Sequence, residues 1–256
     1  MALSIFHSFF VPYFIFSPAA AQLPPFSVIC HPQRLILYWG AEVFSMIFSL
    51  LAAEASALLA GVLGARWVNG LYAANPDIMS FPDQVPRQQQ RHARLLCGLL
   101  SLLFCYTVLT MRAADAIHLA FLLFFEFFLL VYTMTDFEQQ VIFDRMLVPF
   151  ALAALVSLPL LGRDIPDHLI AGAAGFAVFL ILAVATRGGI GGGDIKLIAA
   201  LGLWLGTDQL LTVACTGMIL GGVAALLLLV TKRRKRGEMF AYGPYFTVAA
   251  LVLTLI

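Results

Sequence analysis

The sequence GGIGGGDIKL, residues 188–197, follows one strongly apolar segment and opens the next. It places five glycines and an aspartate in a chain that is 62% hydrophobic. Glycine disfavours a helix by about 1 kcal/mol relative to alanine, and an aspartate in or beside a bilayer is costly. Short, glycine-interrupted apolar segments often mark functional sites in membrane proteins. This stretch therefore predicts a functional site at the end of a membrane helix.

The whole chain is too apolar for a soluble domain. Charged residues make up 11% of its 256 residues, and its mean hydropathy is +0.96, whereas soluble domains carry about 25% charged residues. The predicted fold class is all-α, a polytopic transmembrane helix bundle. The four cysteines are scattered without a CxxC pair, so we expect no metal site and no disulfide framework.

The apolar segments predict eight to nine spans, because about 20 apolar residues cross the hydrocarbon. The first segment, 4–22, ends like a signal peptide but lacks a basic start, and we expect residues 1–22 to be retained. The candidate spans are 4–22, 35–65, 95–111, 116–135, 146–161, 168–186, 195–207, 209–230 and 239–256.

The basic residues set the orientation. With nine spans and a cytoplasmic N-terminus, twelve of the fifteen Lys and Arg residues fall on the cytoplasmic side, as the positive-inside rule requires. The cluster KRRKR, 232–236, should contact anionic membrane lipid, and we expect no nucleic-acid partner. The chain divides into residues 1–94, with two spans and a polar cytoplasmic loop, and residues 95–256, a continuous bundle.

In this topology Asp136 and Asp194 lie at cytoplasmic helix ends at similar depth. Two carboxylates held close together share a proton. The ionised partner can then activate water while the protonated partner hydrogen-bonds a substrate carbonyl, which is the division of labour that hydrolyses a peptide bond. Asp194 is the better candidate to ionise first, because it stands near a helix N-terminus. The alternative for each residue alone is an ordinary N-cap or a solvated side chain.

Three ordered motifs resemble the type IV prepilin peptidases, a family of bacterial intramembrane aspartyl proteases. GGGDIKLIAALGLWLG, 191–206, resembles the GxGD motif of that family. TDFEQQVIFD, 135–144, and FAYGPYFTVAAL, 240–251, are similar to two further family motifs. The resemblance covers residues 95–256. It implies a six-span peptidase core in the bacterial inner membrane, with the active site on the cytoplasmic side.

The resemblance also implies a reaction and roles for matched residues. The substrate would be a type IV prepilin or pseudopilin, cut after a short basic leader without a cofactor. Many family members also N-methylate the new N-terminus with S-adenosylmethionine. The resemblance makes Asp136 and Asp194 the catalytic pair, with Gly191, Gly193, Lys196, Asp144, Gly243 and Pro244 as motif or supporting residues.

The chain departs from the family pattern at two places. The loop 73–94 lacks the four cysteines of a zinc site, so we expect no zinc, and methyl transfer is left open. Phe143 stands where the family commonly has proline. The sequence does not give the oligomeric state or the particular prepilin.

Two other classes of protein fit parts of the pattern. A proton-coupled transporter would use intramembrane acids such as Glu126, and a non-catalytic membrane scaffold would keep the motifs as relics. The acids cluster at one membrane surface and no internal repeat relates the two halves, which disfavours a transporter. For Glu126 the simpler interpretation is a hydrogen bond to a neighbouring helix.

Overall fold

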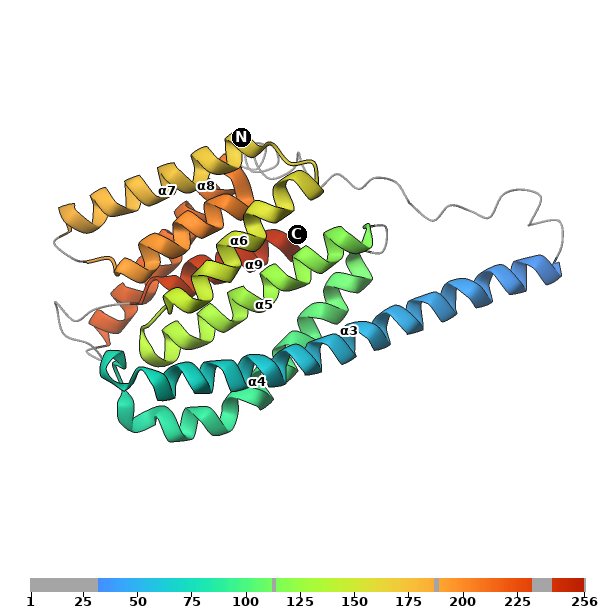
Figure 1. The fold of residues 1–256 in the computed structure, drawn as a ribbon, viewed down its shortest axis with the longest axis horizontal. Helices are drawn as coiled ribbons and strands as arrows, with labels where there is room; N and C mark the ends of the chain where they lie inside the picture. The colour runs from blue at the N-terminus through green and yellow to red at the C-terminus, as the bar shows by residue number, and fades with distance from the viewer. Residues whose placement is uncertain (1–31, 112–113, 187–188, 232–240, 256) are drawn as a thin grey trace.

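The computed structural model describes residues 32–111, 114–186, 189–231 and 241–255 (Figure 1). These residues contain helices and no strand, which confirms the predicted all-α class. Two 3-10 turns, Pro76–Ile78 and Pro82–Gln84, join α3 to α4. The helices are α3 (Pro32–Ala74), α4 (Val85–Thr110), α5 (Ala116–Gln139), α6 (Asp144–Leu160), α7 (Ile165–Ala185), α8 (Gly192–Val230) and α9 (Gly243–Leu255).

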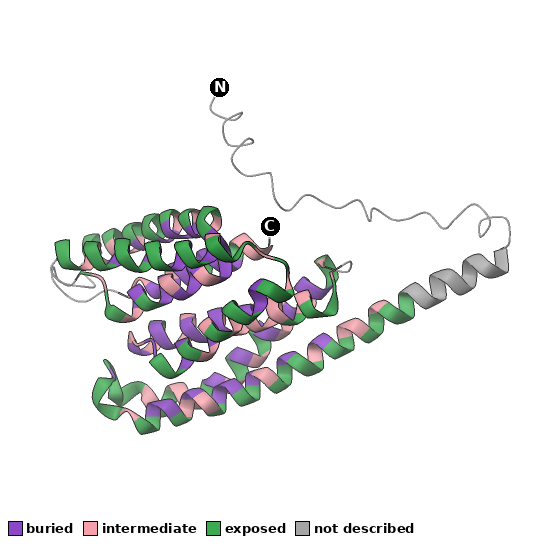
Figure 2. Ribbon diagram, turned by 45° about the horizontal axis from the view of Figure 1, so that its top comes forward, coloured by how far each residue is buried: buried purple, intermediate pink, exposed green. Residues whose placement is uncertain are grey.

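Five of the described helices are long and apolar enough to cross a membrane, so the chain is a multi-pass membrane protein. Helices α6 and α9 have 17 and 13 residues, fewer than the about 20 that a crossing needs. The expected count of eight to nine spans is therefore not confirmed. The first expected span, 4–22, and the KRRKR cluster lie outside the described residues. Buried residues face the centre of the bundle and exposed ones face outward, as a lipid-facing surface requires (Figure 2).

The polar loop 73–94 that the sequence predicts contains two 3-10 turns and the start of α4. Helix α4 begins at Val85, with Pro86 in its first turn, where proline is tolerated because its missing N–H needs no partner. The helix then continues without a break past the boundary at 94/95 and packs along α3. One continuous helix thus joins the two parts of the chain, and their division into separate domains stays a prediction.

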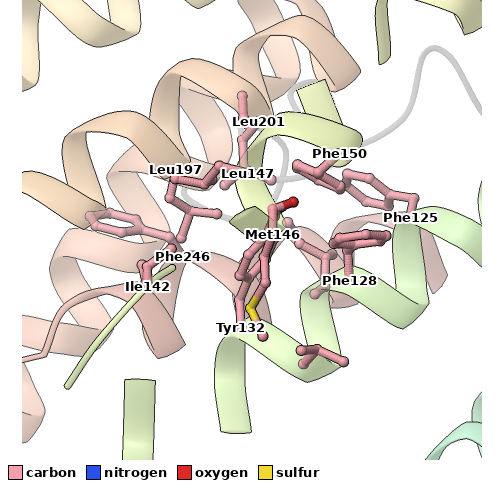
Figure 3. Packing of buried hydrophobic residues seen from close by; sticks show 14 of the residues in the cluster. Phe125, Phe128, Tyr132, Ile142, Met146, Leu147, Phe150, Leu197, Leu201 and Phe246 are labelled. Carbon is pink, nitrogen blue, oxygen red and sulfur yellow. Dashed lines mark hydrogen bonds between the residues drawn. The ribbon is translucent and has the colours of Figure 1, made fainter. Parts of the chain in front are cut away.

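An aromatic core fixes α5 against α6 and α8. Phe125, Phe128 and Tyr132 of α5 pack on Phe150 of α6, and Trp204 of α8 completes the cluster. Figure 3 shows the part of this core around Phe150. The polar groups of the two amphipathic rings are hydrogen-bonded. The Trp204 Nε1–H donates to the Phe150 carbonyl at 3.0 Å, and the Tyr132 hydroxyl donates to the Met146 carbonyl at 2.9 Å. The core therefore sets how α5 and α8, which carry the two motif aspartates, lie relative to each other.

A break in the helical backbone at Gly206, inside α8, lies close to the boundary expected between the segments 195–207 and 209–230. The backbone there has φ 75° and ψ −179°, a conformation that favours glycine. The side chain of Asp167 accepts the N–H of Thr207 at 3.1 Å and also its hydroxyl. On the other side of the break, His168 Nδ1 lies 3.0 Å from the Leu203 carbonyl. Residues of α7 thus supply the partners that the broken helix lacks.

We expect Gly206→Ala to destabilise the protein by about 1–3 kcal/mol, the cost of a backbone held in a sparsely populated conformation. The added Cβ would also collide with Asp167 Oδ2. Thermal unfolding in detergent measures the loss. Gly222→Ala, on the same helix and with nothing within 4 Å of the new Cβ, should leave the unfolding temperature unchanged or raise it. Equal behaviour of the two variants would contradict the account of the break.

Candidate active site

Two buried carboxylates meet beside the start of α9. Asp136, in the last turn of α5, is 4% exposed, and Asp194, in the first turn of α8, is 5% exposed. A Cβ built on Gly243, the first residue of α9, would collide with Asp136 Oδ2 and lie 3.0 Å from Asp194 Oδ1. Both carboxylates therefore face the same glycine Cα. The structure brings together the two aspartates that the sequence singles out, although they are 58 positions apart in the chain.

The surroundings of the two carboxylates differ. The backbone N–H groups of Gly191, Tyr242 and Gly243 face Asp194, whereas among the described residues Asp136 is faced by the N–H of Gly243 alone. Asp136 Oδ2 is buried and has no hydrogen-bond partner among the described residues. Backbone dipoles and a helix N-terminus both favour negative charge. Asp194 is thus better placed to carry the charge of the pair, and Asp136 to carry the proton.

A cavity of about 220 Å³ opens in front of the pair. Its walls include both aspartates, Ser80 from the turn before α4, and the glycines that precede α8. At Gly193 a Cβ would lie 3.1 Å from the Ile142 Cβ, so a side chain there would press on the opposite wall. Glycine walls let a substrate backbone approach closely. The cavity can hold a water molecule and a peptide carbonyl beside the two carboxylates.

The supporting motif residues take other positions. Lys196 Nζ donates to both oxygens of Asp144, at 2.7 and 2.9 Å. Its partner in the described residues is thus Asp144 and not the catalytic candidate Asp194. Both side chains of this ion pair are more than half exposed, and such surface pairs contribute about 0–1 kcal/mol. Gly243 and Pro244 are buried at the start of α9, and Gly191 lines the cavity.

A buried polar cluster next to Asp136 was missed in the sequence. His92 of α4 is fully buried; its Nε2 lies 2.7 Å from Glu138 Oε2 and its Nδ1 lies 2.6 Å from Asn69 Oδ1. Tyr72 also donates to Glu138, at 3.3 Å. The cluster joins α3, α4 and α5 two residues after Asp136. The polar sequence around His92 shows no clear helical period, so it gave no sign of this cluster. The role of His92 depends on Glu138, which lies 46 positions away in the chain.

A second set of hydrogen bonds fixes the turn that carries Ser80. The Gln139 side chain accepts the Phe81 N–H at 2.9 Å and donates to the Phe81 carbonyl at 3.0 Å. Gln139 also donates to Gln88 of α4 at 2.6 Å. The Gln139 side chain thus hydrogen-bonds both backbone polar groups of Phe81, the residue after Ser80 in the cavity wall. The turn between α3 and α4 is fixed to the same helix end as Asp136.

A third contact joins α5 to α9 beneath the pair. The hydroxyls of Thr133 and Thr247 lie 2.7 Å apart, and Thr247 donates to the Gly243 carbonyl at 3.1 Å. Thr133 precedes Asp136 by almost one helical turn. The contact therefore fixes the position of Gly243 along α5 relative to Asp136.

We expect His92→Ala to destabilise the protein by about 1–3 kcal/mol, because it leaves Glu138 and Asn69 without their buried partner. Thermal unfolding in detergent measures this loss. Arg91→Ala changes the adjacent, exposed residue of the same helix and should have little effect. If both variants unfold at the wild-type temperature, the cluster contributes nothing to stability and our interpretation of it is wrong.

Glu126 lies away from the pair, inside α5. It is fully buried, and Thr107 of α4 donates to its Oε1 at 2.5 Å. The expected hydrogen bond to a neighbouring helix is confirmed. Its other carboxyl oxygen has no partner among the described residues.

Comparison with known proteins places the aspartate pair in a family. Residues 121–226, which contain both aspartates, match the type IV leader peptidase family. The resemblance drawn from the three motifs is confirmed. No solved structure gives a significant match to the chain.

Several curated proteins are similar to part of this chain, and each is named a prepilin leader peptidase/N-methyltransferase. The Neisseria gonorrhoeae protein is 34% identical over 133 residues, 49% of this chain and 45% of its own length. The Bacillus subtilis protein is 29% identical over 130 residues, 50% and 52% of the two chains. The Pseudomonas putida protein is 27% identical over 165 residues, 62% and 56%. The chain spans about half the length of the relatives that it matches.

Proposed function

We propose that the protein is an intramembrane aspartic endopeptidase that removes the short basic leader from type IV prepilins or pseudopilins. The observation that carries the proposal is the pair of buried carboxylates, Asp136 and Asp194, that both face one glycine of α9 and both line a glycine-walled cavity. The names of the relatives support the substrate class. A transporter needs a site at mid-membrane, and two acids inside the described spans, Glu54 and Glu126, are hydrogen-bonded to Ser101 and Thr107 of α4.

In this mechanism the two carboxylates share one proton. Ionised Asp194, which faces three backbone N–H groups, takes a proton from a water molecule, and the hydroxide attacks the scissile carbonyl carbon. Protonated Asp136 donates a hydrogen bond to the carbonyl oxygen and stabilises the charge that develops there. A proton then passes to the leaving amine as the C–N bond breaks. The products are a leader with a new carboxylate and a pilin with a new N-terminal amine.

The proposed location is the bacterial inner membrane, with the pair on the cytoplasmic side. The support is the distribution of Lys and Arg along the sequence. A cysteine introduced at exposed Asp77, in the turn near the cavity, tests the orientation in a chain whose four native cysteines are replaced by serine. A membrane-impermeant maleimide should label it in inverted vesicles and leave it unlabelled in intact cells.

Methyl transfer is a second, separable part of the proposal. S-adenosylmethionine would supply an electrophilic methyl group to the new amine. A larger cavity of about 410 Å³ adjoins the site, but its one carboxylate, Asp144, is already held by Lys196. The residues that line this cavity therefore do not indicate a binding site for a cationic methyl donor. The mass of the cleaved pilin decides the point, because methylation adds about 14 Da to the product.

Cleavage of a co-expressed prepilin tests the proposed function. The wild-type protein should shift the pilin to higher mobility, and mass spectrometry should place the new N-terminus directly after the leader. A pilin panel left uncut by a protein that is inserted at a normal level would overturn the proposal. Proton-dependent solute flux through the wild-type protein would then favour the transporter.

A further inference from the structure

A separate cavity of about 200 Å³ lies at the end of the bundle opposite the aspartate pair. It is lined by His118 near the start of α5, Arg163 between α6 and α7, and Trp204 just before the break in α8. Along α5, eighteen residues separate His118 from Asp136, which is about 27 Å at 1.5 Å per residue. This is close to the roughly 30 Å thickness of the hydrocarbon. The cavity therefore lies at the membrane interface on the other side from the aspartates.

The polar lining of this cavity carries donors and no carboxylate. Its polar groups are those of His118, Arg163, His168, Gln209 and Thr254. The Thr254 hydroxyl already donates to the Leu251 carbonyl, and the indole N–H of Trp204 donates to the Phe150 carbonyl. The nearby acid Asp167 is engaged by the backbone N–H and hydroxyl of Thr207. The lining is thus suited to an anion.

Arg163 is a half-buried cation without an acidic partner. Its Nη1 donates to the Trp204 carbonyl at 2.6 Å, and no carboxylate lies within ion-pair distance in the part of the chain that the structure describes. Burial lowers the pKa of Arg163, but a guanidinium stays protonated in proteins. A guanidinium has five N–H donors, so most of them are left for a ligand. A partly desolvated cation of this kind favours a bound anion.

The remaining lining is apolar and favours a lipid over a small ion. Leu122, Phe125, Leu205 and Leu253 form the wall beside the donors. A phosphate alone would leave that wall without a partner. A phospholipid presents a phosphate and the start of an acyl chain together, at the depth where the cavity lies.

We propose that this cavity binds the phosphate of an anionic phospholipid in the leaflet opposite the aspartate pair, with Arg163 as its cationic anchor. The apolar wall then contacts the first carbons of an acyl chain. The ligand would lie against Trp204 and Leu205, the last residues of the α8 segment that carries Asp194 at its other end. The site is independent of the proposed peptidase activity.

Thermal unfolding of the purified full-length chain in mixed micelles tests the site. Phosphatidylglycerol should raise the unfolding temperature by about 2–4 °C more than the same mole fraction of phosphatidylcholine, as a ligand that binds only the folded state does. Native mass spectrometry should show one phosphatidylglycerol retained. Arg163→Gln should abolish both effects and Arg163→Lys should keep part of them. Arg145→Gln removes an exposed arginine from the aspartate end and should keep both.

Three results would overturn the proposal. One is an equal temperature rise with the two lipids. Another is a phosphatidylglycerol effect that survives Arg163→Gln. The third is an equal rise with inorganic phosphate, which would assign the cavity to a free anion. Arg163→Gln also removes the donor to the Trp204 carbonyl, so Leu122→Trp supplies a second test. It fills the cavity, leaves Arg163 in place, and should abolish the preference for phosphatidylglycerol.

Discussion

Replacement of Asp194 by asparagine should lower the rate of prepilin cleavage by roughly 10²–10⁴-fold, the range that general acid–base groups contribute. Asparagine keeps the shape of the side chain but carries neither the charge nor the proton. Asp136→Asn should lower the rate to a similar extent. Because the two carboxylates act as one unit, the double variant should be no slower than the slower single variant. A mobility-shift time course with a co-expressed prepilin, at matched protein levels, measures all three.

The control for this series is Asp77→Asn. Asp77 is an exposed acid in the turn after α3, on the same side of the bundle as the pair, and its loss should leave cleavage within a factor of two of wild type, roughly the scatter of measured single-site effects. Cleavage that persists in either Asp136→Asn or Asp194→Asn would show that the pair is not catalytic. Loss of cleavage in all variants, Asp77→Asn included, would instead show that any change on this side disturbs insertion.

The fold class was predictable because its causes are local. Long apolar segments specify helices in a bilayer, and charged residues at their ends specify where the helices stop. The break at Gly206 was not predictable in the same way. Its stability depends on Asp167 and His168, which lie about 40 positions earlier and meet it only after α7 packs on α8. The sequence did place a boundary between 195–207 and 209–230, close to the break at Gly206, but it gave neither the backbone conformation of the break nor its partners.

The two carboxylates of the candidate site were predictable from the sequence, whereas the residues around them were not. Asp136 and Asp194 stand out because a buried acid at a helix end needs a reason. Ser80 and His92 do not, because an isolated serine or histidine in a polar segment is ordinary. Their positions follow from Gln139 and Glu138, which hold the turn and α4 against the end of α5. The side chains with a proposed chemical role could be recognised from the sequence. The side chains that position other residues could be recognised only from their contacts in the structure.

Gly243→Ala should lower cleavage by at least about 100-fold while the protein still folds and inserts. The new Cβ would collide with Asp136 Oδ2 and crowd Asp194 Oδ1, so the two carboxylates would have to separate. A displacement of about 1 Å in a catalytic group can cost about 100-fold in rate. Prepilin cleavage and thermal unfolding of the same preparation measure the two properties together.

The matched control is Gly98→Ala in α4, where an added Cβ has nothing within 4 Å; its cleavage rate should equal that of wild type. The Gly243 variant separates two explanations for the glycine. If the glycine serves only to start α9, alanine, a good helix former, should be tolerated and cleavage should persist. If the glycine is needed because two carboxylates and a backbone N–H share the space in front of its Cα, even one methyl group should abolish the reaction. Persistent cleavage by Gly243→Ala would therefore contradict the close approach on which the proposed mechanism depends.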